Sequence, residues 1–143
     1  MGAAVAPSLF QVLAEHGARD VASVYLFGSV AEGRAHRESD VDLGVLLGWT
    51  SYGSAAQRFD AGIRLAGALE SLLGRTVDLV VLNDAPPLLG RHVVTRGRCV
   101  LCRDSRADHT YVRDVQLRAA DLEPWLRRMR ALKLGAIRGT RQR

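Results

Sequence analysis

The sequence predicts an α/β (α+β) fold, with a small mixed β-sheet flanked by helices. Short runs rich in β-branched and aromatic residues alternate with longer stretches whose apolar residues recur at helical spacing. The chain has 143 residues, which is about one domain. Its 48% hydrophobic and 24% charged residues are typical of a globular protein. We find no repeat, and no linker long enough to separate two domains.

The first half of the chain predicts a helix, two strands and an intervening loop. Residues 7–16 have helical apolar spacing, with Pro7 at the start. Residues 21–27 are β-branched and aromatic, and 30–38 are small and polar, with room for one helical turn and a loop. The nearly continuous apolar run over 41–47 indicates a strand buried on both faces.

The second half continues with a helix, a strand, a short helix, a strand and a long helix. Residues 54–73 form a helix closed by Gly74, with a predicted core face of Phe59, Ile63, Ala66, Leu69 and Leu73. Strands follow over 76–82 and 98–102, separated by a helix that begins at Pro86-Pro87 and runs to about residue 95. From about residue 106 an amphipathic helix carries Tyr111, Val115, Leu122, Trp125 and Met129. We expect Pro124 to kink or split it. Trp125, with Leu122 and Met129, is expected to pack on the sheet, and a stripe that binds a partner is the alternative.

Several classes of protein are excluded by missing motifs. The only lysine is Lys133, so there is no phosphate-binding Gly-Lys-Ser/Thr loop, and no two glycines stand two apart as a dinucleotide fingerprint requires. The four histidines match no zinc spacing.

Cys99 and Cys102 are three apart on a strand, so we expect them to face opposite sides as buried thiols. No apolar run is long enough for a membrane span, and no charged leader begins the chain, so we predict a cytoplasmic protein.

One stretch carries residues suited to phosphate chemistry. Gly28-Ser29 follows a strand and opens a helical turn, where free N–H groups and a hydroxyl suit an anion. Asp40 and Asp42 are two apart at the start of a strand, so both carboxylates point to one face and need a cation between them. Asp78 is an acid in another apolar strand and is the candidate third ligand.

These residues match a known family. Gly28-Ser29, ten further residues and then Asp40-Val41-Asp42 resemble the signature of the DNA polymerase β-like nucleotidyltransferase superfamily. Ser39–Leu43 and Asp78–Asn83 are similar to its minimal group, called MNT. The resemblance implies the polymerase β-like fold as a single domain over 1–143, with a core over about 7–105 and a helical arm over about 106–143.

The resemblance also implies an activity, which is transfer of AMP from ATP to a hydroxyl with release of pyrophosphate. Gly28, Ser29 and the adjacent amides would hold the terminal phosphates. Asp40 and Asp42 would bind two Mg²⁺ ions, and Asp78 would hold the second ion and help deprotonate the acceptor. The sequence departs from the family at Glu32, where MNT proteins often carry Arg. Arg34 or Arg37 could supply the missing positive charge.

The acceptor implied by the resemblance is another protein. MNT proteins are commonly antitoxins that pair with a HEPN-domain RNase toxin and can adenylylate its tyrosine, so we expect a hetero-oligomer with such a toxin. Two alternatives stay open: an antitoxin that acts by binding alone, and a small-molecule nucleotidyltransferase of the aminoglycoside-modifying kind. Only about 40 residues follow the sheet, which is little for enclosing a small acceptor.

The C-terminal segment carries the positive charge of the chain. The net charge is +5, and residues 127–143 hold seven basic residues and no acidic one. We predict that 106–143 is the partner-binding arm, with Arg127, Arg128 and Arg130 facing an acidic partner surface. No aromatic residues are interleaved with the basic ones beyond Trp125, so we expect no direct nucleic-acid binding.

Overall fold

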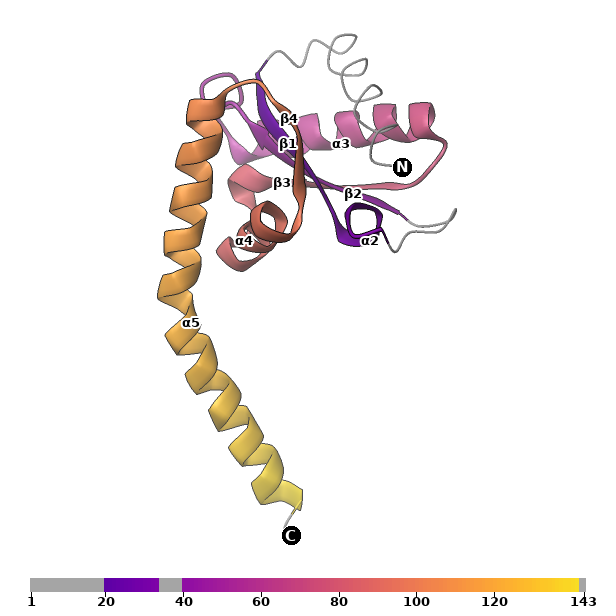
Figure 1. The fold of residues 1–143 in the computed structure, drawn as a ribbon. Helices are drawn as coiled ribbons and strands as arrows, with labels where there is room; N and C mark the ends of the chain where they lie inside the picture. Colours follow the sequence, from indigo (N-terminus) through magenta and orange to yellow (C-terminus); the bar gives the residue numbers. More distant parts are fainter. Residues whose placement is uncertain (1–19, 34–39, 142–143) are drawn as a thin grey trace.

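A four-stranded mixed sheet forms the centre of the protein. The computed structural model describes residues 20–33 and 40–141 (Figure 1). The strands are β1 (Val21–Phe27), β2 (Val41–Leu47), β3 (Val77–Val81) and β4 (Arg98–Cys102). They lie in the order β3-β2-β1-β4, and β1 is antiparallel to both neighbours while β2 and β3 are parallel. The predicted fold class is confirmed, whereas the helix expected over 7–16 lies outside the described residues.

Helices cover both faces of this sheet. The helical elements are α2 (Gly28–Ala31), α3 (Ala55–Leu73), the 3₁₀ turn η1 (Leu82–Asp84), α4 (Pro87–Arg96) and α5 (Ser105–Arg141). One core cluster joins Val41, Leu43 and Val45 of β2 to α3. The other joins Leu46 on the opposite face to Val93 of α4. None of the helices in the described ranges is long and apolar enough to cross a membrane.

Helix α3 has the predicted ends and part of the predicted core face. Ser54 caps it in a reciprocal bond pair with Gln57, and Gly74 closes it in the left-handed conformation. However, Phe59 is 68% exposed and Ile63 is 56% exposed. The buried positions are Arg58, Ala61, Gly62, Leu65 and Leu69. Of the predicted face, Leu69 is buried and Ala66 and Leu73 pack against the core. The prediction was wrong at Phe59 and Ile63, because Arg58, which apolar periodicity counts as outward, is drawn inward.

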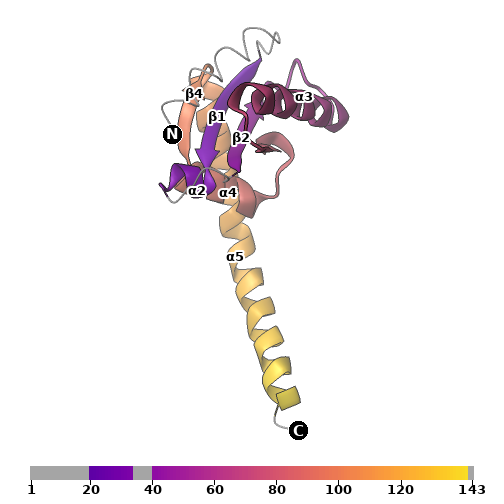
Figure 2. The ribbon, with the colours of Figure 1, turned by 90° about the vertical axis from the view of Figure 1, so that its right-hand side faces the viewer.

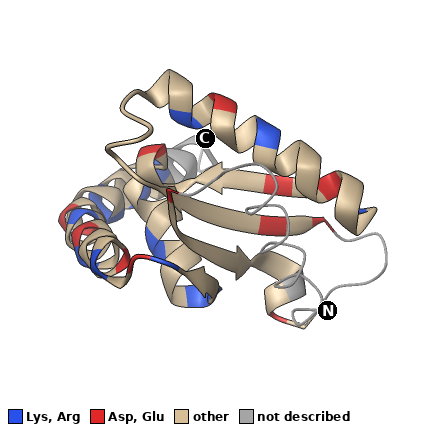
Figure 3. Cartoon of the chain, turned by 90° about the horizontal axis from the view of Figure 1, so that it is seen from above, with Lys and Arg blue, Asp and Glu red and all other residues tan. Residues whose placement is uncertain are grey.

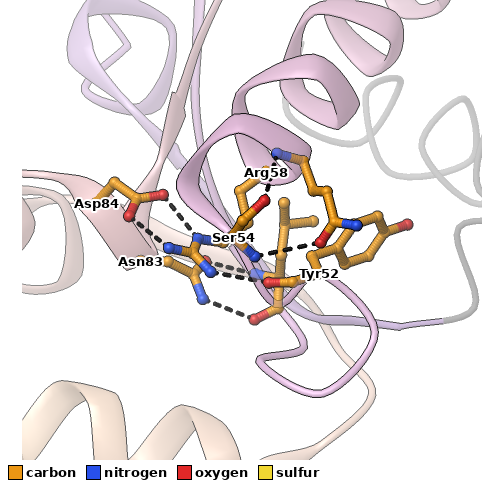
Figure 4. A network of polar contacts seen from close by, with 7 residues as sticks. Tyr52, Ser54, Arg58, Asn83 and Asp84 are labelled. Carbon is orange, nitrogen blue, oxygen red and sulfur yellow. Dashed lines mark hydrogen bonds and ion pairs between the residues drawn. The ribbon is translucent and has the colours of Figure 1, made fainter.

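Arg58 is held inward by a polar network that joins three elements (Figure 4). Its guanidinium donates to both carboxylate oxygens of Asp84 at 2.8 and 2.9 Å, and to the carbonyl of Tyr52 at 2.8 Å. Asn83 accepts from the Leu47 N–H and donates to the Leu47 carbonyl, both at 2.8 Å. Thus the turn after β3 is tied to the end of β2 and to α3, which holds the register of the two parallel strands.

Helix α5 is anchored at its start and exposed beyond its middle. Asp108 is 7% exposed, and its Oδ1 accepts 2.7 Å hydrogen bonds from the hydroxyls of Ser23 and Tyr25 on β1. Pro124 lies inside one continuous helix that changes direction part-way along, so the helix is not split. The distal half extends away from the sheet in Figures 1 and 2, and Trp125 is 51% exposed. The expectation that Trp125 packs on the sheet was therefore wrong.

The two cysteines also differ from the prediction. Tyr25 pairs with Cys99 and Ser23 with Cys102, with a register shift between Val24 and Tyr25. Because this bulge adds a residue to β4, Cys99 and Cys102 lie on one face of the sheet rather than on opposite faces. Both are exposed free thiols, and partial burial together with the nearby Asp108 carboxylate raises their pKa values.

Candidate active site

Two of the predicted acids lie side by side at the start of the parallel strands. Asp42 of β2 pairs in register with Asp78 of β3, so their side chains point to the same face at the strand spacing of about 4.8 Å. Val41 and Leu43 face α3, so Asp42 points to the opposite face, the one that α4 covers. Figure 3 shows acidic residues on two neighbouring strands. The sheet therefore brings together residues that are 36 positions apart in sequence.

The electrostatics of Asp42 show that the acids are crowded. Asp42 is half-buried, whereas Asp40, just before β2, and Asp78 are exposed. The pKa of Asp42 is raised above its usual value of 3.8, first by burial, then by the negative charge of Asp78 and then by that of Asp40. This region therefore favours a bound cation, which would relieve the repulsion.

The Gly28-Ser29 turn lies directly against Asp42. Phe27, the last residue of β1, pairs in register with Asp42, so the following residue turns across the carboxylate. Gly28 has φ +74°, and a Cβ built on it would lie 2.1 Å from Asp42 Oδ2. The Glu32 N–H then donates to the Gly28 carbonyl at 3.1 Å and closes the α2 turn that contains Ser29. Glycine is required here both by the backbone conformation and by the close approach of the acid.

The C-terminal end of α4 packs beside the Gly28-Ser29 turn, which the sequence did not predict. The ring of His92 on α4 makes an edge-to-face contact with Phe27, with centroids 6.3 Å apart. Arg96 Nη2 lies 3.3 Å from Glu32 Oε1. The only signal in the sequence is the spacing of four between His92 and Arg96, which places them on one side of a helix. Arg34 and Arg37, the expected substitutes for a family arginine, lie outside the described residues.

A comparison with protein families matches the part of the chain that carries these residues. Residues 9–106 match the family described as polymerase beta nucleotidyltransferase. The chain belongs to this family. The match covers all four strands and both segments that carry the acids, so this nucleotidyltransferase has the polymerase β-like fold that its sequence resembles.

A curated relative is similar to part of this nucleotidyltransferase. The protein adenylyltransferase MntA of Shewanella oneidensis is 43% identical over 75 residues, which make up 52% of this chain. The match spans 50% of the relative, so the chain is aligned to about half of that protein's length.

Solved structures share the fold over nearly the whole chain. A toxin–antitoxin crystal structure with AMP-PNP matches with a TM-score of 0.66 and 25% identity, over 92% of this chain and 97% of the matched one. A tri-AMPylated Shewanella oneidensis HEPN toxin in complex with an MNT antitoxin matches with a TM-score of 0.63 and 23% identity, over 96% and 98% of the two chains. At this identity the second match establishes the fold alone.

The donor set at the acids suits a hard divalent cation. Carboxylate oxygens are the ligands that Mg²⁺ prefers, and the pKa of Asp42 is raised first by burial and then by the negative charges of Asp78 and Asp40. Within residues 20–33 and 40–141, no group of three His, Cys, Asp or Glu side chains is already arranged to hold a metal ion. Asp42 and Asp78 therefore fit such a cation by chemistry and by register, while the exposed Asp40 and Asp78 side chains would have to adjust around it.

Proposed function

We propose that this nucleotidyltransferase is an antitoxin that transfers AMP from ATP to a hydroxyl group of its partner toxin. The observation that carries the proposal is the register pair Asp42–Asp78 lying beside the Gly28-Ser29 turn. The MntA relative is named a protein adenylyltransferase, and the similar toxin–antitoxin structure contains AMP-PNP, an ATP analogue. We place the reaction in the cytoplasm, where ATP is available.

We assign the nucleotide to the side of the site formed by the end of β1. Ser29 and the backbone N–H groups of the turn would bind the terminal phosphates, as expected for a strand followed by a helical turn. Asp40, Asp42 and Asp78 would hold two Mg²⁺ ions, which neutralise charge on the triphosphate when bound. Crowding three acids at one edge is unfavourable without such a cation, and the raised pKa of Asp42 supports this assignment.

In the transfer itself the acceptor oxygen forms a bond to the α-phosphorus of ATP. The bond from that phosphorus to the bridging oxygen breaks, pyrophosphate leaves with the electron pair, and the hydroxyl proton passes to Asp78. The residues of this chain mainly orient the two reactants, because positioning and charge stabilisation supply most of the rate in phosphoryl transfer.

We propose a tyrosine of a HEPN-type toxin as the acceptor and the distal part of α5 as the element that positions it. Trp125, Met129 and Leu132 lie at helical spacing and are 51%, 46% and 69% exposed. Arg127 and Arg128 are exposed beside them. Trp and Arg are the residues most enriched at the centre of binding interfaces, and such an arm gives a hetero-oligomer with the toxin.

The proposal is tested by transfer of radiolabel from α-labelled ATP to the toxin expressed with this protein. We expect label on the toxin with the wild-type protein and Mg²⁺, and none with Asp42→Asn. Full neutralisation of the toxin without ATP would contradict the proposal and support an antitoxin that acts by binding alone. Label on an aminoglycoside but not on the toxin would instead support a small-molecule enzyme.

A further inference from the structure

An ion pair joins the end of α4 to the turn that follows β1. Arg96 Nη2 lies 3.3 Å from Oε1 of Glu32, the residue directly after α2, although the two are 64 positions apart in sequence. The side chain of Glu32 is 26% exposed and that of Arg96 is 68% exposed. Both residues lie at the surface, and much of the Arg96 guanidinium remains open to a ligand.

The backbone around Arg96 is fixed close to the candidate nucleotide site. The Gly97 N–H donates to the Val93 carbonyl at 2.9 Å and ends α4. A Cβ built on Gly97 would lie 2.9 Å from the Leu26 carbonyl oxygen and 3.1 Å from Phe27 Cβ. The helix therefore ends against the last residues of β1, which directly precede the Gly28-Ser29 turn. This contact fixes the backbone of Arg96 near the turn.

The charges around this turn call for a cation. Asp42, Asp78 and Asp40 lie close enough to raise the pKa of Asp42, and Glu32 adds a fourth acid beside α2. A nucleoside triphosphate would bring several more negative charges to the same place. A guanidinium has five N–H donors in a planar fork, so one edge can bind a carboxylate while the other binds a phosphate.

The ion pair itself is not a source of much stability. Exposed ion pairs contribute little to the free energy of unfolding, because water screens them and two long side chains must be ordered. What the pair does provide is position, because Glu32 Oε1 holds Nη2 of the guanidinium beside α2 while most of the Arg96 side chain stays exposed.

We propose that Arg96 binds the triphosphate of the nucleotide, and that Glu32 is a positioning residue that holds the Arg96 guanidinium beside the Gly28-Ser29 turn. This inference rests on the proposed function and adds two residues to its site. It predicts that Arg96 distinguishes ATP, which has the terminal phosphates, from AMP, which lacks them.

Equilibrium binding of ATP and of AMP to the full-length protein with Mg²⁺ tests this assignment. We expect Arg96→Ala to weaken ATP binding about tenfold or more, as for loss of a hydrogen bond between charged groups, and to leave AMP binding within about twofold. Arg96→Lys should recover part of the loss. Arg64→Ala is the matched control, because Arg64 is 70% exposed, pairs with Asp60 at 3.2 Å and lies on α3, across the sheet.

A double-mutant cycle tests the positioning role of Glu32. In the wild-type background Glu32→Ala should weaken ATP binding, because the guanidinium loses its direction. In the Arg96→Ala background the same change should have a clearly smaller effect on ATP binding, because no guanidinium is left for Glu32 to position. Weakening of equal size in both backgrounds would overturn the positioning role.

The outcomes separate this inference from the proposed function. If Arg96→Ala matches Arg64→Ala in ATP affinity while Asp42→Asn abolishes AMP transfer, Arg96 is not a phosphate ligand and the proposed function stands. If the wild-type protein neither binds ATP nor transfers AMP, the proposed function is wrong and the role of Arg96 falls with it. Thermal unfolding and circular dichroism of each variant establish that it is folded.

Discussion

Replacing Gly28 with alanine is expected to abolish AMP transfer while leaving the protein folded. The new Cβ would lie 2.1 Å from Asp42 Oδ2, well inside van der Waals contact, so the carboxylate must swing away. A displacement of about 1 Å at a reacting group can cost on the order of 10²-fold in rate. We therefore expect a loss of about 10²-fold or more in label transfer to the toxin.

The effect on stability should be modest, and Gly33 provides the control. Gly28 and Gly33 have φ +74° and +72°, so alanine at either site carries the same left-handed backbone cost of about 1–2 kcal/mol. A Cβ on Gly33 has nothing within 4 Å. Gly28→Ala also forces the Asp42 side chain away from its preferred rotamer, which lowers the free energy of unfolding by about 0.5–1.5 kcal/mol more.

Urea unfolding and label transfer measured on both variants decide the question. We expect similar losses in the free energy of unfolding, and a loss of transfer in Gly28→Ala that greatly exceeds that in Gly33→Ala. Equal transfer rates in the two variants would refute the reasoning, because the contact with Asp42 would then have no part in the reaction.

Two further predictions concern the acids and the arm. Asp42→Asn should raise the free energy of unfolding at neutral pH without Mg²⁺, since it removes a partly buried charge that the neighbouring acids repel. Because the folded-state pKa of Asp42 is raised, protonation favours folding, so this gain should vanish below pH 3.8, as thermal unfolding against pH would show. Arg127→Glu combined with Arg128→Glu should weaken the toxin complex, more strongly at low salt, and leave ATP binding intact. Calorimetric titration at two salt concentrations checks this, and unchanged affinity would assign the interface elsewhere.

The strands and the acids could be predicted from sequence because their signals are local. A run of apolar residues defines β2, and side chains alternate between the faces of a strand, so the face of Asp42 needs no knowledge of the rest of the chain. Asp78 was predicted because an acid in an apolar strand is costly unless it has a role. The pairing of β2 with β3 then places it in register with Asp42.

Features that depend on distant partners could not be predicted in this way. The face of α3 is set by the bond between Arg58 and Asp84, which are 26 positions apart. The common face of Cys99 and Cys102 depends on a bulge whose position is defined only by pairing with β1. The ion pair between Glu32 and Arg96 forms because α4 ends against β1, and no local pattern shows that these two residues meet.

The exposure of the distal half of α5 has a consequence for how tightly a partner can be held. Such a segment is stabilised mainly by its own backbone hydrogen bonds, so it unfolds locally at little cost in free energy. A partner that binds only the helical form therefore loses binding free energy to the entropy cost of folding the segment. Gly135 lies within this segment, and glycine inside a helix costs about 1 kcal/mol relative to alanine. A Cβ there would meet nothing within 4 Å. Replacing Gly135 with alanine would thus favour the helical form and lengthen the residence time of the toxin complex without adding a contact.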